Sequence, residues 1–152
     1  MKIRRALFTP AALLLFAAMA GGTPAHAADA LVPISGIVSG QPESVAFSGQ
    51  AQVNSRLAPD PDFGRPTLVF TIDLTGVSGV GSSTAEKYVI SGPEIVQRGL
   101  AASHQVEITF PFVKSTMGMS ATRTGVASFT LDVDVNTGAV TSATGSVASP
   151  SF

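Results

Sequence analysis

The sequence of 152 residues contains no cysteine and no tryptophan, and only 12% of its residues are charged. Without cysteine the chain has no disulfide framework, no thiolate zinc site, no iron–sulfur cluster and no cysteine nucleophile. Soluble domains usually contain about 25% charged residues, so ionic surfaces are scarce in this protein. The length suits one domain with a real core. These absences exclude classes of protein, and no motif in the sequence names a function.

The N-terminal segment has the pattern of a secretory signal peptide. Three basic residues come first: Lys2, Arg4 and Arg5. The apolar run of residues 11–20 follows, and Ala25 and Ala27 supply the small residues of an A-x-A cleavage site. The run is about half of the ~20 apolar residues that cross a bilayer, so a membrane anchor is the weaker interpretation. We expect a bacterium to remove residues 1–27 and to deliver residues 28–152 to the periplasm or the medium, with membrane contact only during export.

Removal of this segment changes the charge balance. It takes away three of the nine basic residues and none of the ten acidic ones, which leaves six against ten and moves the formal net charge from −1 to −4. Six scattered cations form no patch that would neutralise phosphates, so we expect no nucleic-acid partner. His104 becomes the only histidine, which excludes a zinc site built from histidine and cysteine.

Apolar and polar residues alternate along most of the remaining chain, which is the pattern of β-strands with one wet face. The clearest predicted strands are Glu43–Arg56, Thr67–Leu74, Gln105–Phe112 and Ala127–Val135. Weaker candidates are Ile34–Val38, Glu86–Ile90, Ile95–Gln97 and Val140–Val147. No window carries a helical stripe, and only Arg98–His104 has room for one helical turn. The sequence therefore predicts a single all-β domain over residues 28–152, an antiparallel β-sandwich or a small β-barrel of about seven or eight strands.

Turn-forming residues separate these strands. The glycine-rich run Gly76–Gly81 resembles a phosphate-binding loop, but Ser82 stands where that loop needs lysine, so we interpret it as a flexible turn. The proline-rich stretch Leu57–Pro66 is expected to be an irregular surface loop, because proline cannot donate in a central ladder. Met117 and Met119 fall in another predicted loop, where they offer an adaptable apolar contact.

Three oxygen-bearing residues at every second position, Asp132, Asp134 and Asn136, resemble the ligands of a calcium loop. The glycine and the glutamate that such a loop needs at its sixth and twelfth positions are missing. The alternative interpretation is that the aspartates face outward from a strand and that 136–138 is a three-residue hairpin loop, with Gly138 for positive φ. We favour the hairpin and expect no metal and no cofactor, while calcium stays the alternative.

Catalytic motifs are scarce. There is no G-x-S-x-G elbow and no Ser-x-x-Lys pair, and a serine triad would have to use His104, for which an exposed strand-edge position is expected. We therefore expect no catalytic residue. A hydrolase with an unrecognised carboxylate pair stays open, because a fold can bring any of the ten acidic residues together.

The remaining expectation is an exported, non-catalytic binding or structural module of the periplasm or envelope. Its partner is a protein or a small apolar ligand, and an unpaired strand edge is the natural surface for a protein. Five phenylalanines take inward positions: Phe47, Phe70, Phe110, Phe112 and Phe129. They either line a cavity for an apolar ligand or fill the core, and we favour the core. A small outer-membrane β-barrel is a further alternative, and the oligomeric state stays open.

Overall fold

The computed structural model describes residues 29–59, 62, 64–116 and 121–151. Over these residues the chain forms strands and no helix. The nine strands are β1 (Ala30–Val38), β2 (Val45–Pro59), β3 (Pro66–Asp73), β4 (Val77–Gly81), β5 (Lys87–Ile90), β6 (Pro93–Gly99), β7 (Ser103–Lys114), β8 (Arg123–Val133) and β9 (Val140–Ala148). The predicted all-β class is thus confirmed, with one strand more than expected.

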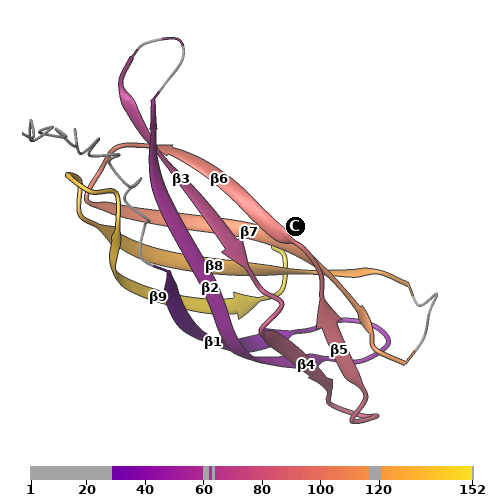
Figure 1. The fold of residues 1–152 in the computed structure, drawn as a ribbon. Helices are drawn as coiled ribbons and strands as arrows, with labels where there is room; N and C mark the ends of the chain where they lie inside the picture. The colour runs from indigo at the N-terminus through magenta and orange to yellow at the C-terminus, as the bar shows by residue number, and fades with distance from the viewer. Residues whose placement is uncertain (1–28, 60–61, 63, 117–120, 152) are drawn as a thin grey trace, which may run out of the picture.

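Seven of the strands close into a barrel (Figure 1), so the barrel is the correct one of the two predicted architectures. The order around the ring is β1-β9-β8-β7-β5-β4-β2, and the ring closes because β2 also pairs with β1. All neighbours are antiparallel except β1 and β9, which meet in parallel at Gly36 and Val147. A Cβ atom at Gly36 would collide with the carbonyl oxygen of Val147. Glycine at this position therefore permits the closure.

The long strand β2 belongs to two parts of the molecule. Its residues 45–49 pair with β4, whereas its residues 52–59 pair with β3, which in turn pairs with β6. We call the part that contains β4, β5 and the start of β2 the sealed end. The other part, with 52–59, β3, β6 and the start of β7, is the split end, because there β6 and β7 do not pair. Figure 1 shows β4 and β5 at one end of the barrel and the β2–β3 hairpin at the other.

Aromatic rings fill the sealed end. The ring centroid of Phe47 lies 5.6 Å from that of Phe110 and 5.0 Å from that of Phe112, both edge to face. Tyr88 continues the cluster, 5.8 Å from Phe112. Such contacts between perpendicular rings stabilise a core beyond the area they bury. All five phenylalanines predicted to face inward are at most 2% exposed, which confirms that prediction.

Three phenylalanines each lie opposite a glycine on the neighbouring strand. The phenylalanine ring occupies the space that a side chain at the glycine would fill. The cross-strand pairs are Phe47–Gly79, Phe110–Gly125 and Phe129–Gly145. A Cβ atom at Gly79 would lie 2.7 Å from the ring of Phe47, and one at Gly125 would lie 2.5 Å from the ring of Phe110. Small residues opposite large ones let the rings fill a narrow barrel.

The glycines also explain the clearest error of the sequence interpretation. The run Gly76–Gly81, predicted to be a turn, supplies strand β4. Its residues alternate between buried and exposed like those of any half-buried strand. Gly79 and Gly81 take inward positions where neighbouring side chains leave no room for a Cβ atom. The glycines therefore reflect packing in a strand and not flexibility.

Three smaller corrections concern strand ends. Arg98–His104 contains no helical turn, because β6 continues to Gly99 and β7 begins at Ser103. Leu57–Pro66 is less irregular than predicted, since β2 extends to Pro59 and β3 begins at Pro66. The hairpin between β8 and β9 spans residues 134–139 instead of three residues. The role of Gly138 was predicted correctly, since its φ is 75°.

Candidate functional site

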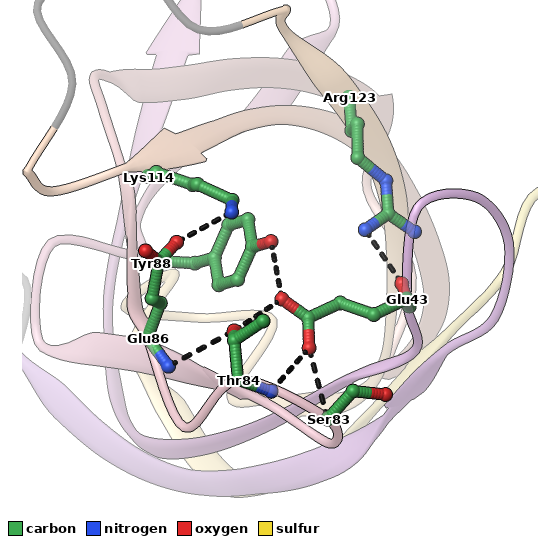
Figure 2. Close-up of polar contacts among 7 residues, drawn as sticks. All are labelled: Glu43, Ser83, Thr84, Glu86, Tyr88, Lys114 and Arg123. Carbon is green, nitrogen blue, oxygen red and sulfur yellow. Dashed lines mark hydrogen bonds and ion pairs between the residues drawn. The ribbon is translucent and has the colours of Figure 1, made fainter.

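At the sealed end, the carboxylate of Glu43 accepts four hydrogen bonds (Figure 2). Its Oε2 accepts hydrogen bonds from the backbone N–H groups of Ser83 (2.9 Å) and Thr84 (3.0 Å). Its Oε1 accepts from the Thr84 hydroxyl (2.7 Å) and from the Tyr88 hydroxyl (2.9 Å). Glu43 is only 6% exposed, and both of its oxygens have two donors. The acceptor capacity of a carboxylate is thereby used up.

Two cations lie near this carboxylate, Arg123 and Lys114. Arg123 donates from Nη1 to the backbone carbonyl of Glu43 at 2.8 Å and lies over the ring of Phe112. Lys114 pairs with Glu86, with 2.5 Å between Nζ and Oε2, and lies 5.9 Å from the centre of the Tyr88 ring. Figure 2 shows these residues around the sealed end of the barrel.

These contacts explain the acidity of Glu43. The hydrogen bond from the Thr84 side chain and that from the Ser83 backbone lower the pKa of Glu43 from 4.5 to about 2, against the opposing effect of burial. Burial and the bond to Glu43 raise the pKa of Tyr88 above its ordinary value. Glu43 thus stays charged at any ordinary pH, and it has no free lone pair for a substrate. We interpret the cluster as a polar plug that holds the 82–86 turn on the barrel.

A groove of about 720 Å³ lies at the split end, across the outer face of β7, β8 and β9. Two rows of side chains cross its floor, following the register of the three strands. One row is Gln105, Thr130 and Thr144, and the other is Glu107, Ser128 and Ser146. Arg98 of β6 lines the groove beyond β7. The floor is therefore made of hydroxyl and amide groups, with one acid and one cation at the β6–β7 side.

The edge of β7 beside this groove has unpaired backbone groups. Val133 donates its backbone N–H to the carbonyl of Ala102 at 2.8 Å, which fixes the alternation of β7 against β8. Residues with even numbers bond to β8, and those with odd numbers direct their N–H and C=O groups the other way. On that side β5 covers only Phe112–Lys114. Among the described residues no strand covers the N–H groups of Ser103, Gln105, Glu107 and Thr109.

The position of a proline supports this alternation. Pro111 is the ninth of the 12 residues of β7 and lies opposite Thr124. Because 111 is odd, the N–H group that proline lacks would point away from β8. Proline therefore removes no hydrogen bond between β7 and β8. Proline within a sheet is normally confined to such edge positions.

The residues of the calcium hypothesis take other roles. The Oδ1 atom of Asp134 accepts hydrogen bonds from the backbone N–H (2.9 Å) and the side-chain amide (3.2 Å) of Asn136. These bonds, led by that of the Asn136 backbone, lower the pKa of Asp134. Asp132 is exposed on the outer face of β8. Over the described residues no three His, Cys, Asp or Glu side chains lie close enough together to hold a metal ion.

His104 lies closer to the core than an exposed edge position. It is half-buried, its ring lies 5.3 Å from that of Phe70, and its Nε2 lies 3.0 Å from the carbonyl oxygen of Ala101. Its parity is that of the inward residues of β7, which explains this packing. The cleavage-site residues Ala25 and Ala27, and the loop residues Met117 and Met119, lie outside the described residues.

Sequence reasoning missed Glu43 as a buried residue, although a signal was present. Glu43 has the same parity as Val45 and Phe47, the inward residues of the predicted strand 43–56. The same parity applies to Ser55, which is 1% exposed and donates from its hydroxyl to the carbonyl of Gly138 at 2.6 Å. Both polar residues therefore continue the inward row at its two ends.

Comparison with known proteins adds no identification. No protein-family model, no curated protein and no solved structure matches this chain. Nor does the described part of the chain contain a helix long and apolar enough to cross a bilayer. We therefore infer the function from the geometry of the groove and of the β7 edge.

Proposed function

We propose that this protein is an exported, non-catalytic binding module of the periplasm or cell envelope, which captures an extended polypeptide along the free edge of β7. The observation that carries the proposal is the row of outward N–H and C=O groups from Ser103 to Thr109, next to the groove. An added strand would gain main-chain hydrogen bonds along this edge. Every second side chain of that strand would point toward the groove.

The groove supports selection among such segments. Glu107 and Arg98 are the two charged residues that line it, so a bound segment gains from charges opposite to theirs. Serine and threonine hydroxyls both donate and accept hydrogen bonds, which suits polar side chains of either kind. Affinity then comes from the backbone and specificity from these side chains.

The alternative functions have less support. A glycoside hydrolase needs two accessible carboxylates, whereas Glu43 is bonded by four donors and Glu86 is paired with Lys114. A membrane barrel has an apolar band outside, whereas the outward rows of β7, β8 and β9 carry Gln, Glu, Ser and Thr. The packing of the phenylalanines against one another likewise supports a filled core over a cavity for an apolar ligand.

The export step has its own test. The full chain, expressed in a bacterial host, should appear in the periplasmic fraction with Ala28 as its first residue, as read by mass spectrometry. Replacement of both Ala25 and Ala27 by Phe should block the cleavage, because the site accepts only small residues. Intact protein in the cytoplasm would contradict the proposal.

The binding step can be tested with a library of random linear peptides displayed on phage. We expect selection on the purified protein to enrich peptides with alternating side chains. Glu107→Pro should weaken their binding by about tenfold or more, because it leaves a carbonyl of the bound strand without its donor. The substitution keeps the β8 ladder intact, as Pro111 does at the same parity.

Glu107→Ala is the matched control, because it removes the side chain and keeps the N–H group. It should change binding much less than Glu107→Pro. Gln105→Pro repeats the test at a second outward position, and unchanged melting temperatures show that the variants fold. Failure to enrich any peptide, or equal binding to the Glu107→Pro and Gln105→Pro variants, would reject the proposal.

A further inference from the structure

We infer that two copies of this chain pair antiparallel through β6, around a two-fold axis at Val96. This interface shares Arg98 with the groove beside the edge of β7, but it does not depend on the proposed function. β6 pairs only with β3 among the described strands and ends the extension of the sheet beyond β2 and β3 (Figure 1). An open edge of this kind accepts another strand.

The alternation of hydrogen bonds shows which groups of β6 are free. Gln50 donates its N–H to the carbonyl of Gly76, so the even residues of β2 bond toward β4 and β3. The odd residues of β3 therefore bond to β2, and its even residues bond to β6. By the register of β3 and β6, the residues of β6 that bond to β3 are Glu94, Val96 and Arg98. The odd residues then direct their backbone groups outward.

Two further observations agree with this alternation. Arg98 donates from Nη1 to the carbonyl of Gln97 at 3.0 Å, which shows that this carbonyl is reached from outside the ladder. Pro93 has the parity of Ile95 and Gln97, so its missing N–H lies on the free side and costs no bond to β3. The free edge of β6 thus presents N–H groups of Ile95, Gln97 and Gly99.

The charges of β6 fit a second copy in one register. With the axis at Val96, Ile95 lies opposite the partner's Gln97, and their outward backbone groups can exchange hydrogen bonds when Arg98 turns from the Gln97 carbonyl to the partner's Glu94. The same register places Glu94 opposite the partner's Arg98, and the symmetry repeats this pair. Axes at Ile95 or at Gln97 also match the free backbone groups, but they place neither charge opposite its counterpart. Opposite charges across a ladder stabilise a strand pair, and like charges destabilise it.

Because of this symmetry, the charges of Glu94 and Arg98 favour pairing with a second copy. Charged side chains on an edge strand normally prevent its pairing with another copy. Here Glu94 and Arg98 stand two residues on either side of Val96, so an antiparallel copy presents the opposite charge to each of them. The contact would also cover Ile95, which at 69% is the most exposed large apolar side chain among the described residues.

The experiment is a concentration series of the full chain in sedimentation velocity. We expect a monomer–dimer equilibrium that weakens at high salt, because the ion pairs are close to solvent. Glu94→Arg and Arg98→Glu should each weaken the dimer by about tenfold or more, because the symmetry turns two attractive pairs into two repulsive ones. The double variant Glu94→Arg/Arg98→Glu should restore the dimer.

Lys87→Glu is the matched control, because it reverses an exposed charge on β5 at the sealed end and should leave the dimer unchanged. Ile95→Pro removes a free N–H group and should also prevent pairing, and melting temperatures confirm that each variant folds. A monomer at all concentrations would overturn the inference. So would a dimer that resists both single reversals, or a double variant that stays monomeric.

Discussion

The sealed end and the split end of the barrel use polar groups in opposite ways. At the sealed end β4 and β5 complete the ring, and the buried carboxylate of Glu43 has a donor for each of its lone pairs. At the split end β6 and the first part of β7 have backbone groups with no partner strand among the described residues. The sealed end therefore contributes stability, and the split end is where we propose that binding occurs. One long strand, β2, joins the two.

The largest expected difference between the ends is in their cores. Phe47→Ala at the sealed end should lower the free energy of unfolding by about 3–5 kcal/mol. Its cross-strand neighbours are Gly36 and Gly79, which have no side chains to fill the cavity. Phe70→Ala at the split end should cost about 1 kcal/mol less, because half-buried Val96 lies opposite and can move in. Urea denaturation of both variants gives the comparison, and an equal or larger loss for Phe70→Ala would contradict it.

Two glycines allow the sealed end and the split end to be compared through smaller losses of stability. Gly81→Ala should cost about 1–3 kcal/mol, because its Cβ atom would displace the Glu43 carboxylate from its donors. Gly99→Ala at the end of β6 should stay within about 0.5 kcal/mol, because no atom lies within 4 Å of the added carbon. Thermal unfolding of the two variants measures both effects. If the Gly81→Ala variant were as stable as the Gly99→Ala variant, the Glu43 carboxylate could move aside without a loss of stability.

The plug should also make stability depend on pH in acid. The pKa of Glu43 is lowered from 4.5 to about 2 in the folded protein, so the unfolded chain takes up its proton first as the pH falls. The stabilisation by the carboxylate is therefore complete above about pH 4.5 and is lost as the pH falls toward 2. Glu43→Gln should destabilise the protein at pH 7 and flatten its stability between pH 4.5 and 2.

Asp134 provides the control at the split end. Its pKa is lowered too, so it acts in the same direction, but it is bonded within its own turn. Asp134→Asn should therefore change the acid slope less than Glu43→Gln. The measurement is urea denaturation at several pH values between 2 and 7. An unchanged slope in the Glu43→Gln variant would show that the carboxylate does not stabilise the fold.

The sequence predicts the sheet well, because alternation requires only that one face of each strand is buried. The strand Gln105–Phe112 was found within β7, with its inward phenylalanines. Strand β4 was missed because its inward residues include Gly79 and Gly81. These residues must be small because Phe47 of β2 and Glu43, two residues before β2, occupy the space beside them. Such a cause is tertiary, and the pattern within 76–81 does not contain it.

The candidate site was even less predictable. Nothing in residues 103–109 distinguishes a strand paired on both sides from one paired on a single side, because the side-chain pattern is the same. The free edge of β7 follows from the point at which β5 stops pairing, after three residues. An unpaired edge could be expected in general, but its position depends on the ring.

The smallest effect is the most direct test of the split, because it compares amides on one strand. Val113 and Glu107 have the same parity in β7, but only Val113 lies opposite a residue of β5, Val89. In hydrogen exchange the amides of Gln105, Glu107 and Thr109 should exchange on the order of tenfold faster than that of Val113. Val106 and Ile108 should be protected, because their N–H groups bond to β8. If the amide of Glu107 were protected to the same degree as that of Val113, the edge of β7 would already be covered. That result would contradict both the unpaired edge at the split end and the proposed binding along it.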